Sequence, residues 1–171
     1  MQKSNLTEHK RSKSQLWFYR AQMVCIAGLA AVIDQYSKHL ALTHLIPGNS
    51  LPLIPDVIQL SLAFNSGAAF SLLANRPEFL LWISTGLFLI LLSLSLWQAN
   101  SSFILRLGFG LILGGGAGNL LDRMYTGAVT DFIDVILIHY PIFNGGDVFI
   151  FMGSCCVFIH FLGQLKTKQS F

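Results

Sequence analysis

Two aspartates are the residues most able to do acid/base chemistry, because each lies next to strongly apolar sequence. Asp131 lies in a Val-Thr-Asp-Phe segment at residues 129–132, and Asp147 ends a Phe-Asn-Gly-Gly-Asp segment at residues 143–147. Charge in or beside the hydrocarbon layer of a membrane is costly and usually functional. If the two carboxylates meet there, they predict acid/base catalysis. The alternative is two solvated loop carboxylates, an interpretation that Asp134 suits equally well.

A polar stripe precedes these aspartates. Gly115, Asn119 and Arg123 recur every four residues, a spacing that places them on one face of a helix. The conservative interpretation is helix packing, with an interfacial arginine whose charged end reaches water. We favour a functional interpretation, in which the amide and the guanidinium hold a substrate carbonyl or orient a carboxylate. Beside the stripe runs a ridge of small residues that would let another helix approach closely, formed by Gly110, Gly114 and Gly118.

Two further polar segments lie nearer the N-terminus. Asp34 and Lys38 are four residues apart in the order that favours a helical ion pair, and we interpret them as a structural pair. Asn65 begins an Asn-Ser-Gly-Ala-Ala-Phe segment at residues 65–70. By itself this segment indicates only a turn that carries a polar side chain.

The elements that must position these residues are membrane helices. The chain has 171 residues, of which 53% are hydrophobic and only 11% are charged, which excludes an ordinary soluble domain. A transmembrane helix needs about 20 apolar residues, and four segments meet this length, at about 23–45, 79–97, 104–121 and 148–165. We expect one membrane domain over residues 1–171, with outer segments at 46–78 and 122–147.

The distribution of charge predicts the orientation of these spans. Basic residues mark cytoplasmic segments, and they collect in the tail at residues 1–20, near Arg106, and after the last span, at Lys166 and Lys168. Both termini are therefore expected to be cytoplasmic, as an even number of spans requires. A cleaved signal peptide is the alternative for the first span, but the basic tail is long for one.

The outer segments suggest two kinds of structure. Residues 57–62 alternate between apolar and polar side chains, which predicts short strands. Residues 122–147 mix acids with apolar residues and are expected to lie in the plane of the membrane interface. The predicted fold class is a mainly α membrane protein of four transmembrane helices, with a small extracytoplasmic β-rich segment and an interfacial helix.

Five segments together resemble the lipoprotein signal peptidases (signal peptidase II), four-span bacterial aspartic peptidases. They occur in the family's order at residues 34–38, 65–70, 114–123, 129–132 and 143–147. Each is weak alone, but five in order on this topology are highly specific. Gly146 is a departure, because the family usually has alanine there. Glycine is equally small but adds backbone freedom, so we expect the position of Asp147 to be adjusted and its role kept.

The resemblance implies a function and a site. The enzyme would be an aspartic endopeptidase that removes the signal peptide from diacylglyceryl-modified bacterial prolipoproteins, cleaving just before the lipidated cysteine. Asp131 and Asp147 would form the catalytic dyad. The residues that bind substrate or support the dyad would be Asn65, Gly115, Asn119, Arg123 and Asn144, while Asp34 and Lys38 remain structural motif positions.

The resemblance also implies the setting of the enzyme. We expect a multi-pass protein of the bacterial cytoplasmic (inner) membrane with its active site at the outer face. We expect a monomer that contacts membrane lipid, uses no metal or cofactor, binds no nucleic acid and is inhibited by globomycin-type cyclic peptides. The alternatives are a small proton-coupled transporter, which would need acids near the bilayer midplane and an inverted repeat, and a non-catalytic scaffold, which leaves the polar stripe unexplained.

Overall fold

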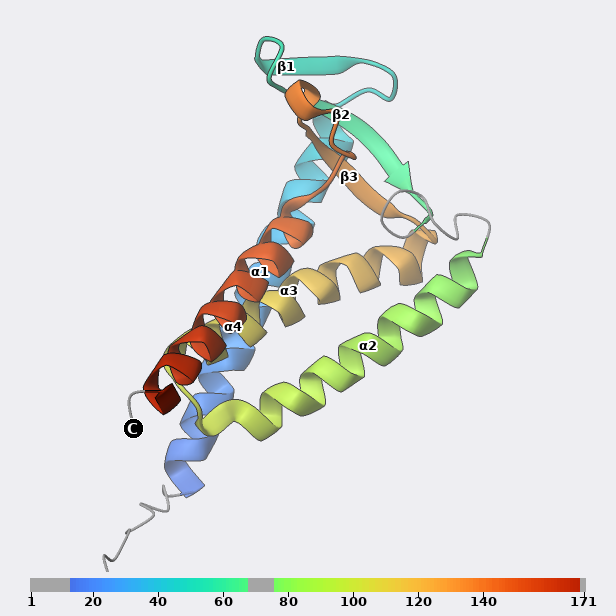
Figure 1. The fold of residues 1–171 in the computed structure, drawn as a ribbon. Coiled ribbons are helices and arrows are strands. Elements are labelled where there is room, and N and C mark those ends of the chain that lie inside the picture. Colours follow the sequence, from blue (N-terminus) through green and yellow to red (C-terminus); the bar gives the residue numbers. More distant parts are fainter. Residues whose placement is uncertain (1–12, 68–75, 170–171) are drawn as a thin grey trace, which may run out of the picture.

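The computed structural model of this chain describes residues 13–67 and 76–169, and four long helices dominate it (Figure 1). The basic residues of the tail up to Arg11, and Ala68–Phe70 of the 65–70 segment, lie outside the described residues. The helices are α1 (Lys13–His44), α2 (Pro77–Trp97), α3 (Phe103–Thr126) and α4 (Gly145–Gln169). Each contains a segment long and apolar enough to cross a membrane. The prediction of a mainly α membrane protein with four spans is confirmed.

Helix α3 is the centre of the bundle. It packs closely against α4 and α1, and α2 packs mainly against α3. Most of the apolar part of α3 is buried, whereas the other three helices present most of their side chains outward. Large apolar side chains such as Val32, Trp82 and Phe151 are exposed on these outer faces, as expected of surfaces that contact lipid.

Glycines set the distance between α3 and its two neighbours. The ridge predicted from the sequence faces α1, because methyl groups added at Gly110, Gly114 and Gly118 would collide with α1. Gly108 and Gly115 face α4 instead, where added methyl groups would collide with backbone carbonyl oxygens. Small residues on two faces of one helix therefore let both partners approach to backbone contact.

A small antiparallel sheet stands at one end of the bundle, in the strand order β1 (Ser50–Ile54), β2 (Ile58–Asn65), β3 (Val129–Asp134). Phe132 on β3 packs with Ala41 in the last turn of α1 and with Leu45 directly after that helix, which anchors the sheet to α1. Adjacent residues of a strand point to opposite faces. Asp131 therefore points away from this apolar cluster.

The two segments predicted to lie outside the membrane differ in two respects from the prediction. Strands were expected from residues 46–78, but the third strand, β3, comes from the second outer segment. The helical part between β3 and α4 is limited to the three-residue 3-10 helix η3 (Ile136–Ile138). The β-branched run of β3 pairs with β2 from Val129 to Asp134, and this pairing satisfies backbone groups that an isolated interfacial segment would leave to water.

The two ends of the bundle carry different charges. The start of α1, the connection η2 (Gln98–Asn100) and the end of α4 lie at the end opposite the sheet (Figure 1). Lys13, Arg20 and Arg106 belong to that end by their positions in α1 and α3. The acids of the predicted site belong to the sheet end. The chain is therefore polarised along the helix axes.

The close approach of α3 and α1 yields a test of the packing. A methyl group at Gly114 would lie 2.5 Å from the carbonyl oxygen of Ala27, whereas one at Gly116 would meet only a ring carbon of Phe88 at 3.9 Å. Gly114→Ala should lower the free energy of unfolding by about 1–3 kcal/mol, since overpacking forces the helices apart. Thermal unfolding in one detergent measures this loss.

Gly116→Ala is the matched control. It should be neutral or stabilising by up to about 1 kcal/mol, because alanine is the better helix former. Equal unfolding temperatures for the two variants would contradict the packing described here.

Candidate active site

The two predicted aspartates line the same cavity. It has a volume of about 250 Å³, and its walls come from β2, α3, β3, the segment before α4 and the first turn of α4. Asn65, Asn119 and Arg123 line the cavity together with Asp131 and Asp147. The structure thus brings together residues that are up to 82 positions apart in the sequence (65 to 147).

The start of α4 fixes Asp147 through a reciprocal cap. Asn144, directly before the helix, accepts a hydrogen bond at Oδ1 from the backbone N–H of Asp147, with an N···O distance of 3.0 Å. The carboxylate of Asp147 accepts one in return from the backbone N–H of Asn144, at 3.2 Å. Such exchanged bonds satisfy two amides that a helix start otherwise leaves unpaired. They also restrict the rotamer of the Asp147 side chain.

Asn144 also joins the two aspartates. Its side chain is fully buried, and its Nδ2 donates to Oδ1 of Asp131 at 2.6 Å and to Oδ1 of Asn119 at 3.1 Å. These two bonds use both protons of the amide nitrogen. A single asparagine therefore contacts Asp131 through its side chain and Asp147 through its cap.

Asn119 is oriented by a cation. Its Oδ1 accepts from the ammonium of Lys38 at 2.7 Å, and an ammonium can only donate. The amide nitrogen must therefore point the other way, and it donates to Oδ1 of Asp147 at 2.9 Å. The predicted structural residue Lys38 thus determines which end of Asn119 faces the dyad.

Asn65 completes the set of amides at the end of β2. Its Oδ1 accepts from the backbone N–H of Gly67 at 3.0 Å, so its Nδ2 is left to donate to Oδ2 of Asp131 at 3.1 Å. Each of the three asparagines therefore accepts from a group that can only donate and turns its NH₂ toward a carboxylate. Asp131 therefore accepts hydrogen bonds from Asn65 and Asn144, and Asp147 accepts them from Asn119 and from the backbone N–H of Asn144.

Burial sets the charge state of Asp131. Its side chain lies in the strand β3, and only 2% of the residue is exposed. Loss of water raises the pKa of Asp131 from 3.8 to about 6, against the hydrogen bonds from Asn144 and Asn65, which lower the pKa. The neighbouring charge of Asp147 raises the pKa further. A carboxyl group that keeps its proton into this range suits acid/base work near neutral pH.

Arg123 lies at the mouth of the same arrangement. Its guanidinium donates to the backbone oxygens of Asn119 at 3.2 Å and of Gly67 at 3.4 Å. It therefore connects α3 to the turn after β2, and it places a positive charge on the wall of the cavity. Gly115, the third member of the predicted stripe, does not line the cavity. It lies against the backbone of Gly146 and lets the start of α4 approach α3.

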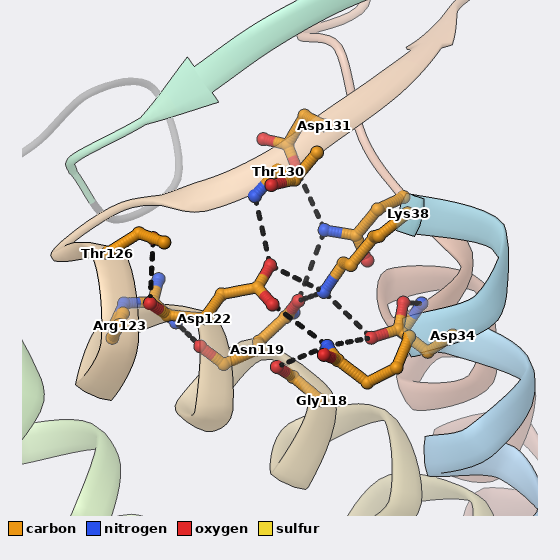
Figure 2. A network of polar contacts seen from close by, with 12 residues as sticks. Asp34, Lys38, Gly118, Asn119, Asp122, Arg123, Thr126, Thr130 and Asp131 are labelled. Carbon is orange, nitrogen blue, oxygen red and sulfur yellow. Dashed lines mark hydrogen bonds and ion pairs between the residues drawn. The ribbon is translucent and has the colours of Figure 1, made fainter. Parts of the chain in front are cut away.

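Behind the cavity lies a network centred on Lys38 (Figure 2). Its ammonium is 2.7 Å from Oδ2 of Asp34, the predicted ion pair, and 3.0 Å from Oδ2 of Asp122. Gln35 bridges the network, since its amide nitrogen donates to Oδ1 of Asp122 at 2.8 Å and to the carbonyl of Gly118 at 3.1 Å. Asp122 was not predicted to be part of the site. Its position three residues after Asn119, on the same face of α3, was the feature of the sequence that could have indicated it.

Asp134 lies apart from the dyad. Its carboxylate accepts hydrogen bonds from Gln59 at 2.7 Å and Ser61 at 3.2 Å, both on β2. It does not line the cavity that holds the two aspartates. Among residues 13–67 and 76–169, no cluster of three His, Cys, Asp or Glu side chains is placed to hold a metal ion.

Known proteins resemble this chain over most of its length. The family model described as signal peptidase (SPase) II matches residues 26–163. A lipoprotein signal peptidase of Gloeobacter violaceus is 41% identical over 153 residues, which cover 90% of this chain and 84% of that protein. A lipoprotein signal peptidase of Brevibacillus brevis is 39% identical over 142 residues, covering 81% and 89% of the two chains.

Solved structures show the same architecture. One, described as a bacterial membrane enzyme, superposes with a TM-score of 0.76 at 26% identity, over 86% of this chain and 92% of the other. A second bacterial membrane enzyme gives a TM-score of 0.71 at 27% identity, over 83% and 93%.

The raised pKa of Asp131 predicts a pH-dependent loss of stability. In the unfolded chain this group titrates near 3.8, and in the folded protein near about 6. Between these values the folded protein holds a proton that the unfolded chain has lost, so stability falls as pH rises and the loss is complete above the folded pKa. Asp131→Asn cannot ionise. Its unfolding temperature relative to wild type should therefore rise between pH 4.5 and pH 7.5.

Asp134→Asn controls for the removal of one carboxylate from the same strand. Thermal unfolding of all three proteins in one detergent, at both pH values, gives the comparison. A constant difference between Asp131→Asn and wild type would show that Asp131 has no raised pKa.

Proposed function

The chain belongs to the signal peptidase II family of membrane aspartic endopeptidases, and we propose that Asp131 and Asp147 together activate the water that cleaves its substrate. Membership of the family makes the substrate a bacterial prolipoprotein, from which the enzyme removes the signal peptide. The proposed cleavage point is just before a cysteine that carries diacylglycerol. One observation carries the proposal: both aspartates line one cavity and both hydrogen-bond to the buried Asn144.

The proposed reaction is a direct attack of water on the scissile carbonyl. The ionised aspartate takes a proton from water, and the protonated one gives its proton to the carbonyl oxygen, which yields a tetrahedral diol. The aspartate that holds the proton from water then passes it to the leaving amine as the C–N bond breaks, and a diol hydroxyl returns its proton to the other aspartate as the carbonyl re-forms. Two carboxylates that share a site do not both ionise easily, so one proton stays on the pair near neutral pH. Burial of Asp131, which raises its pKa to about 6, acts in the same direction. The acid and base roles belong to the pair, because coupled groups titrate as a unit.

Substrate placement is proposed from the walls of the cavity. Arg123 and Asn65 offer donors near the dyad, where they would hold carbonyl groups of the peptide. An apolar hollow of about 380 Å³ shares Tyr140, Phe143 and Asp147 with this cavity. A lipid-modified cysteine needs both a polar site for its peptide bond and an apolar surface for its acyl chains. The position of the apolar hollow beside the polar cavity supports a lipid-modified substrate.

The orientation is proposed from the polarity of the bundle. Basic residues near the start of α1 and near η2 support a cytoplasmic location of that end, by the positive-inside rule. The sheet and the dyad then lie at the outer face of the bacterial inner membrane, and the diacylglyceryl group stays in the adjacent leaflet. We further propose that the enzyme acts as a monomer and that globomycin-type cyclic peptides bind in the cavity.

A proton-coupled transporter gains no support. Its relay would need acids near the bilayer midplane, but here the acids gather at the sheet end of the bundle (Figure 2). The relatives with high identity are named as peptidases. The first span also contributes Asp34 and Lys38 to the network behind the cavity, which supports a retained helix over a cleaved signal peptide.

Loss of either aspartate tests the dyad. Asp131→Asn, Asp147→Asn and the double variant should each lower cleavage of a lipid-modified prolipoprotein by about a thousandfold or more, because members of one catalytic unit do not act additively. A gel-shift assay on purified enzyme measures cleavage, and the amount of protein in the membrane is checked by immunoblot.

Asp134→Asn is the matched control, three residues away on the same strand. Its remaining oxygen can still accept from Gln59 and Ser61, so most activity should be kept. Appreciable cleavage by either dyad variant, or loss of activity in the control alone, would refute the assignment.

Reporter fusions test the orientation. A reporter active only in the cytoplasm should work when fused at the end of α4 and fail when fused in the hairpin between β1 and β2. The reverse pattern would place the dyad at the cytoplasmic face.

A further inference from the structure

The residue directly before each aspartate of the proposed dyad donates its backbone N–H to a carboxylate that lies outside the cavity. Oδ2 of Asp122 accepts from the backbone N–H of Thr130, the residue before Asp131, at 3.0 Å. Oδ1 of Asp34 accepts from the backbone N–H of Gly146, the residue before Asp147, at 2.6 Å. The arrangement is the same on both sides of the dyad, although the two aspartates come from a strand and from a helix.

Lys38 joins these two carboxylates to each other. Its ammonium lies 2.7 Å from Asp34 and 3.0 Å from Asp122, and its remaining contact is to Asn119 at 2.7 Å. The side chains of Asp34 and Lys38 are almost fully buried, and that of Asp122 is 10% exposed. None of the three lines the cavity that holds the dyad. They therefore act on the reaction through the groups they hold and, in the case of Lys38, through its charge, which lowers the pKa of Asp131.

We propose that Asp34 and Asp122, bridged by Lys38, are positioning residues that set the separation of Asp131 and Asp147. This inference rests on the proposed dyad. An ion pair that only pinned α1 would explain the contact between Asp34 and Lys38. It would not explain why the second oxygen of Asp34 binds the start of α4, or why Asp122 binds β3.

The contacts of Asp34, Lys38 and Asp122 can affect catalysis because they help to fix the positions of β3 and α4. The strand β3 and the helix α4 are joined by residues 135–144, which contain the short η3 and Phe143, a residue bridged to Ile133 of β3 by backbone hydrogen bonds. Asp34 and Asp122 in addition bind β3 and the start of α4 to α1 and α3. A misplacement of about 1 Å in a catalytic group can cost about a hundredfold in rate. Because the positioning residues do not touch substrate, their loss should appear in kcat and leave KM nearly unchanged.

Alanine variants test this expectation. Asp122→Ala and Asp34→Ala should each lower kcat about tenfold to a hundredfold, with KM within about twofold of wild type. Two variants are used so that one suffices if the other does not accumulate. Asp122→Asn keeps an oxygen for the Thr130 amide and should retain more of kcat than Asp122→Ala.

Leu105→Ala is the control for loss of stability alone. Leu105 is fully buried in the apolar cluster at the other end of α3, and its loss leaves a cavity far from the dyad. If Leu105→Ala lowers the unfolding temperature as much as Asp122→Ala or Asp34→Ala does, it should still keep kcat within about threefold of wild type. An equal loss of kcat in this control, or a loss that falls on KM in the alanine variants, would overturn the proposal.

Hydrogen exchange gives a readout that does not depend on activity. Asp122→Ala should speed exchange of the Thr130 amide and leave that of Gly146 unchanged, and Asp34→Ala should do the reverse. Unchanged exchange at both amides would overturn the proposal. Failure of the proposed function looks different: the wild type would not cleave lipid-modified prolipoprotein, or Asp131→Asn would still cleave it, while the exchange pattern persisted.

Discussion

The ammonium of Lys38 is the buried charge on which the sheet end of the bundle depends. Only 2% of the residue is exposed, and a buried ion that loses its partners costs several kcal/mol. Its three acceptors lie on two helices, α1 and α3. Two of them, the carboxylates of Asp34 and Asp122, also bind backbone amides of α4 and β3. Satisfying one cation therefore fixes four elements relative to one another.

This polar cluster can form only because α3 lacks side chains where its neighbours approach. The carboxylate of Asp34 occupies the space in which a side chain at Gly118 would lie, and the carbonyl of Gly146 does the same at Gly115. Glycine thus serves two purposes in one helix. On the apolar part of α3 it permits helix packing, and near the sheet it makes room for polar groups that bind the start of α4.

Features that depend on local patterns of residues could be predicted from the sequence alone. Apolar runs of span length predicted the four helices, and the spacing of Asp34 and Lys38 predicted their ion pair. Asp131 and Asp147 were predicted to be a catalytic pair through the resemblance of five segments, and the fold brings both to one cavity. Features that depend on how distant segments cross were missed. Asp122 binds Thr130 only because the end of α3 runs beside β3, and β3 became a strand only because β2 was available to pair with it. The orientation of Asn119 likewise follows from a lysine 81 residues earlier.

The spacing of the partners of Lys38 has a consequence for biogenesis. As the ribosome makes the chain, α1 enters the membrane long before Asn119 and Asp122 have been translated. During that interval the cation has one counter-ion within reach, Asp34, which lies one helical turn away and is made first. The local pair lets a charged helix enter the bilayer at a lower desolvation cost. Asn119 and Asp122 then join Asp34 as partners of the cation, so the proteolytic centre can assemble only once α3 is also in place.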